Sequence, residues 1–100
     1  MNDYILLMHN DTSKPHSADT DAAWGRYFEA LNKSGRFLGG SALGGGQCFA
    51  RSGTPREITA HIGGYIQVQA NSLDDARTFL DGNPVFEGGG TVEIRELSKS

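Results

Sequence analysis

Residues 63–97 read GGYIQVQANSLDDARTFLDGNPVFEGGGTVEIREL, and this stretch decides the fold. Ile66 and Val68 alternate with polar neighbours, which is the two-residue period of a strand with one buried face. Val92 and Ile94 repeat that alternation at the end of the stretch. Capped helical sequence lies between the two alternating segments, so the pattern predicts strand, helix and strand.

The helix between these strands is predicted from its two ends. Ser72 followed three residues later by Asp75 forms a capping box, with Asp in the usual place of Glu. Gly82 and the pair Asn83-Pro84 predict where the helix stops, since Pro disfavours a helical residue before it. Asn83 is therefore interpreted as a helix terminator. The residues expected to be buried are Leu73, Ala76, Phe79 and Leu80.

The N-terminal half repeats the order of elements. The continuous apolar run over residues 4–8 is too short for a free-standing helix and predicts a strand buried on both faces. A helix is predicted over residues 19–33, begun by Asp19 or Thr20 and ended by Gly35. Its apolar stripe, at the spacing i, i+3, i+4 and i+7, consists of Trp24, Tyr27, Phe28 and Leu31.

The segment between these halves is rich in glycine. Residues 36–38 predict the start of an edge strand, which the glycines between residues 39 and 46 would break. Residues 47–51 predict a second arm of that strand, and residues 52–55 predict a turn.

The order of elements predicts an α+β class and a ferredoxin-like βαββαβ fold. Two right-handed crossovers over one antiparallel sheet give this layout, here in one domain over residues 1–100. Its first and third strands are central, and these are the two most apolar predicted strands.

One face of the predicted sheet has no helix to cover it. In the first strand both sets of alternating side chains are apolar, Tyr4, Leu6 and Met8 against Ile5, Leu7 and His9. Either set would leave on the open face an apolar strip that is unusual on an exposed surface. A second copy packed sheet to sheet would cover the strip. We therefore expect a two-fold homodimer of the dimeric α/β barrel type, with a polar cavity between the sheets.

Composition limits the classes of function. Nine scattered Lys and Arg against 12 Asp and Glu give a net charge of −3, which predicts no direct contact with nucleic acid. No apolar run reaches the ~20 residues of a membrane span and no signal peptide is recognised, so we expect a cytoplasmic protein without a membrane partner. The single cysteine, Cys48, fits a reducing compartment.

The same patterns predict neither a metal site nor a cofactor. The three histidines stand at distant positions, without Cys or carboxylates at ligand spacing. The glycines match neither a phosphate-binding loop nor a dinucleotide-binding fingerprint.

The chain resembles the YCII-related family, including its DGPF-domain branch. The resemblance rests on residues 4–8, Trp24 with Phe28 and Leu31, residues 35–38, 63–66 and 72–76, Asn83-Pro84, and residues 92–95. It implies a dimeric α/β barrel of ferredoxin-like halves. It also implies a role in dehalogenation or hydrolysis of small aromatic-like substrates.

Two departures from the family pattern bear on activity. The Asp-Gly-Pro-Phe segment of the DGPF branch is absent, since residues 54–61 read TPREITAH. The other branch carries a His in its first helix and an Asp before the later Pro, proposed as a catalytic dyad. Trp24 and Asn83 hold these two positions here. The resemblance therefore implies weak or absent catalysis, since neither side chain acts as a base.

His9 and His61 are the candidate catalytic residues. His9 with Asp11 suggests a histidine polarised by a carboxylate, or simply a strand-end His beside an exposed loop Asp. His61 with Arg56 suggests a site for an anionic substrate, or a loop His beside a solvated Arg. In both cases the sequence favours the second interpretation. The candidate ligand-binding residues are His9, Trp24, Arg56, His61 and Asn83.

Three functions remain open. The first is a homodimer that binds a small polar or aromatic ligand with weak or no catalysis. The second is a lyase or dehydrochlorinase-like enzyme with His9 or His61 as base. The third is a regulatory or interaction domain linked to transcription regulation. Glu93 and Arg95, two apart on one strand face, are interpreted as a surface ion pair.

Overall fold

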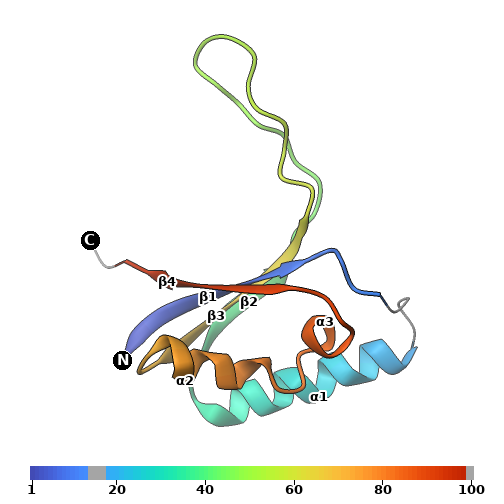
Figure 1. Ribbon diagram of the computed structural model, residues 1–100, viewed down its shortest axis with the longest axis vertical. Helices are drawn as coiled ribbons and strands as arrows, with labels where there is room; N and C mark the ends of the chain where they lie inside the picture. Colours follow the sequence, from blue (N-terminus) through green and yellow to red (C-terminus); the bar gives the residue numbers. More distant parts are fainter. Residues whose placement is uncertain (14–17, 99–100) are drawn as a thin grey trace.

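The computed structural model describes residues 1–13 and 18–98, and its helices lie on one side of a four-stranded sheet (Figure 1). The elements are β1 (Asn2–His9), α1 (Ala18–Ser34), β2 (Phe37–Ala42), β3 (Ile62–Ala70), α2 (Leu73–Arg77), the 3-10 turn η1 (Thr78–Leu80), α3 (Pro84–Glu87) and β4 (Val92–Leu97). The other face of the sheet, which we call the open face, carries no helix (Figure 1).

The sheet has the ferredoxin-like order that the sequence predicts. Its strands run in the order β2-β3-β1-β4, and every neighbouring pair is antiparallel. β1 and β3 are central, as expected from their apolar character. Leu6 lies opposite Ile66 on one side and Ile94 on the other, so one apolar row crosses the sheet.

Burial follows the predicted alternation along the strands. On the helix side Leu6, Ile66 and Val68 are fully buried, and α1 packs Tyr27 and Leu31 into the same core. On the open face, by contrast, the side chains of β1 and β3 are half-buried. The two faces of the sheet therefore differ in burial within a single chain, since the helix face is buried and the open face is half-buried.

The ends of α1 confirm one prediction and correct another. Gly35 ends the helix with φ at +72°, a left-handed conformation that glycine adopts without steric cost. The helix begins at Ala18, so Asp19 and Thr20 lie within the helix and do not precede it as caps. Asp19 in the first turn suits the positive end of the helix dipole.

The second helical region begins as predicted. The Ser72 hydroxyl accepts a hydrogen bond from the N–H of Asp75 at 3.1 Å, which caps α2. The Asp75 carboxylate accepts the N–H of Asn71 at 2.8 Å and pairs with Arg36 at 2.9 Å. Leu73 was expected in the core but is 52% exposed. Helical side chains lean toward the N-terminus, so a residue in the first position leans past the helix end.

The interpretation of Asn83 as a helix terminator is incomplete. The predicted helix is divided into α2 and η1 and ends before Asn83 as expected, but Asn83 is also the N-cap of a further short helix, α3, that the sequence does not predict. Its Oδ1 accepts the backbone N–H groups of Val85 at 3.0 Å and Phe86 at 3.1 Å, with Pro84 in the first helical turn. The residue therefore starts a helix after the preceding one has ended.

The glycine-rich middle differs most from expectation. β2 continues through Gly39 and Gly40, because the chain bulges between Phe37 and Gly39 and passes close to β3. A Cβ atom at Gly40 would lie 2.5 Å from the carbonyl oxygen of Tyr65, so this close approach needs glycine. The predicted strand at residues 47–51 is wrong, because that segment has no strand structure.

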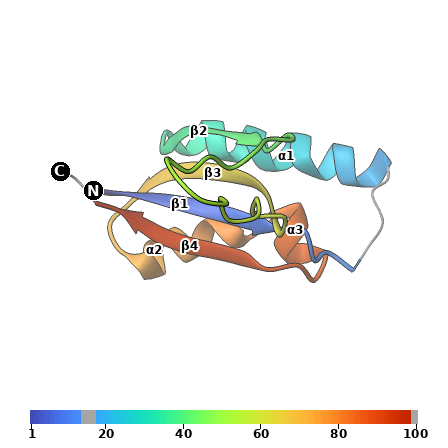
Figure 2. The same cartoon turned by 90° about the horizontal axis from the view of Figure 1, so that it is seen from above.

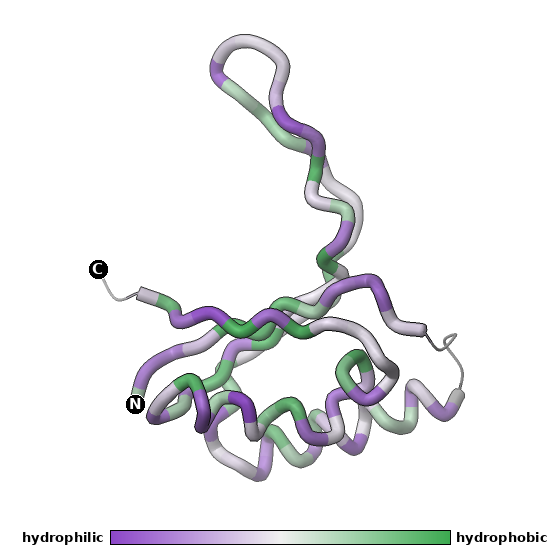
Figure 3. Tube along the Cα trace, in the orientation of Figure 1, coloured by the Kyte–Doolittle hydropathy of each residue, from purple (hydrophilic) through white to green (hydrophobic). Residues whose placement is uncertain are grey.

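Residues 43–61 instead form a long projection, which we call the arm. It leaves the sheet between β2 and β3 and extends far from the body of the molecule (Figures 1 and 3). Its root is held by hydrogen bonds from Leu43 N–H to the Gly63 carbonyl at 2.9 Å and from Asn10 N–H to the His61 carbonyl at 2.8 Å.

Candidate functional site

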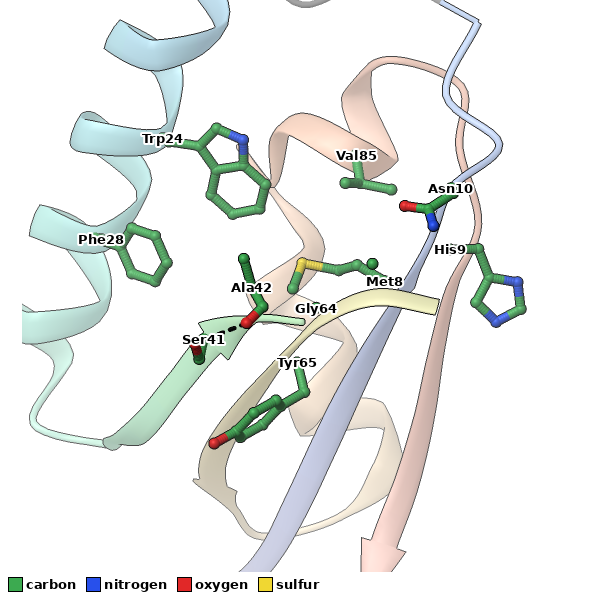
Figure 4. Close-up of a pocket in the computed structure, with 11 residues that line it drawn as sticks. Met8, His9, Asn10, Trp24, Phe28, Ser41, Ala42, Gly64, Tyr65 and Val85 are labelled. Carbon is green, nitrogen blue, oxygen red and sulfur yellow. Dashed lines mark hydrogen bonds between the residues drawn. The ribbon is translucent and has the colours of Figure 1, made fainter. Parts of the chain in front are cut away.

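An apolar cavity of about 350 Å³ opens where α1 passes the end of β2 and β3. Six of its lining residues, from five elements, are Met8, Trp24, Phe28, Ala42, Gly64 and Val85. Figure 4 shows Trp24 and Phe28 on the α1 side, with Ala42, Met8 and Val85 facing them. We call this space the α1 pocket.

The aromatic wall of the α1 pocket is held by packing. The Trp24 ring stacks on Phe28 with centroids 5.5 Å apart and meets Tyr27 edge-on at 5.9 Å. Phe28 in turn contacts Phe37 at 5.8 Å. Because each ring is fixed by its neighbours, the aromatic wall is preformed.

Glycine at position 64 helps to keep the pocket open. A Cβ atom there would lie 3.2 Å from the Met8 methyl carbon and 3.1 Å from the Ser41 carbonyl oxygen. The polar residues His9, Asn10, Ser41 and Tyr65 also contribute to the lining, although the His9 ring is directed away from Trp24 and the Ser41 hydroxyl donates to the Ala42 carbonyl (Figure 4). The pocket therefore combines apolar walls with a few polar groups, as small-molecule sites do.

Asn83, a predicted ligand contact, lies behind the wall of the pocket. Its side chain is fully buried, and its Nδ2 lies 3.7 Å from the Met8 sulfur, which separates it from the cavity. Nearby, the Tyr27 hydroxyl donates to the Phe79 carbonyl at 2.6 Å. Burial raises the pKa of Tyr27, so this hydroxyl stays a neutral donor at neutral pH.

A second group of side chains gathers on the open face, next to the root of the arm. His9 Nε2 and Glu93 Oε1 lie 3.3 Å apart, and the His9 ring meets His61 edge-on with centroids 5.1 Å apart. Arg95 Nη1 lies 3.7 Å from Glu93 Oε2. We call His9, His61, Glu93 and Arg95 the histidine cluster. Figure 4 shows the His9 ring directed away from Trp24 and Phe28.

In the histidine cluster His9 has Glu93 as its hydrogen-bonding partner. The Asp11 carboxylate is instead hydrogen-bonded to Thr91, accepting its N–H at 2.8 Å and its hydroxyl at 2.7 Å, in line with the favoured interpretation of Asp11 as a loop residue beside a strand-end His. These hydrogen bonds lower the pKa of Asp11. Glu93 forms the predicted ion pair with Arg95, and it also lies on the neighbouring strand and on the same face as His9. In a ferredoxin-like sheet β4 lies beside β1, and strand alternation places Glu93 on the same face as His9. These two facts together would have indicated the pair.

The remaining predicted residues separate into two places. His61 stands at the root of the arm and contacts His9, whereas Arg56 is exposed farther along the arm. Neither residue lines the α1 pocket, which Trp24 and His9 do line. Within residues 1–13 and 18–98, no group of three or more His, Cys, Asp or Glu is placed to hold a metal ion.

Comparison with known proteins finds one matching family model and a solved structure of similar fold. A family model described as the YCII-related domain matches residues 1–99. The structure is similar to 5-chloro-2-hydroxyhydroquinone dehydrochlorinase from Burkholderia phenoliruptrix AC1100, solved in complex with 2,5-dihydroxybenzoquinone. The two chains share 20% identity over 100% of this chain and 96% of the other, with a TM-score of 0.62, which shows a common fold. No curated protein matches the sequence.

Helices long and apolar enough to cross a membrane do not occur among the described residues.

Proposed function

Because the chain belongs to the YCII-related family, we propose that it is a homodimer that binds a small aromatic ligand with weak or no catalysis. The observation that carries this proposal is the α1 pocket, whose stacked Trp24 and Phe28 face Met8 and Val85 across a preformed cavity.

The size and polarity of the α1 pocket set the class of ligand. Cavities for small molecules measure about 300–1,000 Å³, and this one, at about 350 Å³, is suited to a single substituted ring. The aromatic wall favours a flat ligand. Asn10 supplies a side-chain amide that can form a hydrogen bond with a hydroxyl or carbonyl substituent at one side of the ring.

Weak or absent catalysis follows from the two residues that stand at the catalytic positions of the family resemblance. Trp24 stands where the family resemblance places a catalytic His. Its indole nitrogen is a hydrogen-bond donor only and cannot accept a proton as a base. Asn83 stands at the Asp position, but it is uncharged and its Oδ1 is already used to cap α3. Binding is therefore the role that the α1 pocket supports best.

Ligand binding is testable with single-ring hydroxybenzenes and benzoquinones, including 2,5-dihydroxybenzoquinone. We expect calorimetry to detect binding, and a ligand at one hundred times its Kd to stabilise the fold by ~2.7 kcal/mol. Ala42→Leu, which fills the pocket, should weaken binding at least tenfold. Leu38→Ala is the matched control, since Leu38 lies on the same strand outside the pocket. Equal binding by wild type and Ala42→Leu contradicts the proposal. It is also contradicted if none of the hydroxybenzenes and benzoquinones binds to wild type.

A second candidate function, base-catalysed elimination, is favoured by one specific observation. His9 is in contact with Glu93 at 3.3 Å and with the His61 ring, which is the arrangement of a histidine oriented by a carboxylate. The dehydrochlorinase of similar fold is named for removing chloride from a small hydroxylated ring. In this alternative His9 would accept the proton of such a ring while Glu93 stabilises the imidazolium.

The elimination hypothesis is tested with 5-chloro-2-hydroxyhydroquinone and a chloride readout. If wild type releases chloride, His9→Gln and Glu93→Gln should each lower kcat by ~100-fold or more. Glu96→Gln, an exposed position on the same strand but the other face, should leave the rate unchanged. Wild type without chloride release, or full activity in His9→Gln, rules this alternative out.

A further inference from the structure

The arm rises on the open-face side of the sheet, away from the helices. Figure 1 shows residues 43–61 on the side of the sheet opposite to α1 and α2. Seen from above in Figure 2, the arm stands over the sheet, in front of β3 and β1. Any body that covers the open face must therefore lie directly beside the arm.

The arm carries apolar side chains that its own chain leaves exposed. Phe49 is 85% exposed, and Leu43 and Ile58 are about half exposed, at 50% and 48%. A connection of this length without secondary structure is uncommon in a compact domain and is usually functional. Exposed aromatic side chains are typical anchors of protein interfaces.

Two properties of the chain point to a second copy as the partner of the arm. The open face presents Ile5 and Leu7 in its centre, and two such faces related by a two-fold axis are self-complementary. The arm contains Arg51, Arg56 and Glu57, a net charge of +1, so the rest of the chain carries −3 − (+1) = −4. The charge of the arm is therefore opposite to the net charge of the body that a second copy would present to it.

We propose that the arm of each copy clasps the other copy of the homodimer, with Phe49 packed against the partner's surface. This inference rests on the homodimer of the proposed function but not on its ligand. Because His61 at the root of the arm contacts His9, docking of the arm also sets the position of the histidine cluster. The second copy then covers the cluster and encloses it between the two sheets.

The clasp is tested by measuring the dimer Kd of wild type and of Phe49→Asp by analytical ultracentrifugation. We expect the dimer Kd of Phe49→Asp to rise at least tenfold while its Tm at high concentration stays close to wild type. Phe86→Asp is the matched control, because Phe86 is also exposed but belongs to α3 on the helix side. Its dimer Kd should stay within twofold of wild type.

Cys48 gives an independent readout, since it is the single cysteine and lies next to Phe49. The experiment mixes ¹⁵N-labelled and unlabelled protein, both carrying a benzophenone maleimide on Cys48, and irradiates the mixture. We expect cross-links between a labelled and an unlabelled peptide, which can form only between two copies. The clasp is ruled out if Phe49→Asp raises the dimer Kd less than tenfold and all cross-links lie within one chain. The homodimer itself would still be supported by that result. Wild type that remains monomeric overturns both, while ligand binding in the α1 pocket is decided separately.

Discussion

The chemistry available to this protein depends on which single residues the fold brings together. Asp11, two residues from His9, is engaged by Thr91, whereas Glu93, 84 residues away, reaches the His9 ring. Trp24 lines the α1 pocket as the sequence suggests, but Asn83 is separated from it by Met8. Distance along the chain is therefore a poor guide to partners, since an antiparallel sheet joins residues from remote strands.

Asp75 gives the protein a pH dependence at the residue scale. The N–H of Asn71 lowers its pKa below the ordinary value of 3.8, and Arg36 adds to this effect. A carboxylate with a lowered folded pKa stabilises the fold above pH 3.8, and this contribution is lost as the pH falls through the folded pKa. Urea unfolding should show Asp75→Asn less stable than wild type at pH 6, with the difference closing below pH 3.8.

The neighbouring carboxylate provides the control for this pH prediction. The Asp74 side chain is 90% exposed, so Asp74→Asn should follow wild type at both pH values. A stability difference for Asp75→Asn that stays constant from pH 6 to pH 3 would show that its charge is not the stabilising feature.

At the scale of elements, glycine has opposite effects on stability at the end and in the interior of α1. Gly35 takes a positive φ to end α1, whereas Gly25 lies in the exposed interior of the same helix with open space around it. We expect Gly35→Ala to lower the free energy of unfolding by about 1 kcal/mol, and Gly25→Ala to raise it by about 0.5–1 kcal/mol. Chemical denaturation measures both, and changes of the same sign in the two variants would contradict this account.

Strand elements were predicted well where apolar alternation is strong and poorly where glycine dominates. The central strands β1 and β3 were recognised from their side chains alone. In β2, Gly39 and Gly40 were read as breakers, although the bulge and the close approach to Tyr65 require small residues there. A glycine in an edge strand and a glycine in a loop look the same in a sequence, because neither has a side chain to show a pattern.

The whole molecule is predicted to be a dimer through its open face. Leu7→Glu places a charge at the centre of that face, and in a two-fold dimer two such charges would meet in the interface. We expect light scattering to show a monomer for Leu7→Glu and a dimer for wild type, with both folded by circular dichroism.

The matched control for the open face is Leu73→Glu, the same substitution at an exposed leucine on the helix side. It should remain dimeric, and glutamate in the first turn of α2 also suits the helix dipole. Dimers of unchanged stability in Leu7→Glu would place the interface elsewhere on the molecule.

The sequence by itself determined the order of the elements, the central place of β1 and β3, and the division of the sheet into a helix face and an open face. These features follow from local periodicity and capping, which each segment carries in its own residues. Only the tertiary structure decided that His9 meets Glu93 and His61, that Asn83 lies behind Met8, and that residues 43–61 stand away from the body as an arm. Such contacts depend on strand register and on the path of a glycine-rich segment, which packing across the whole chain sets and no local pattern records.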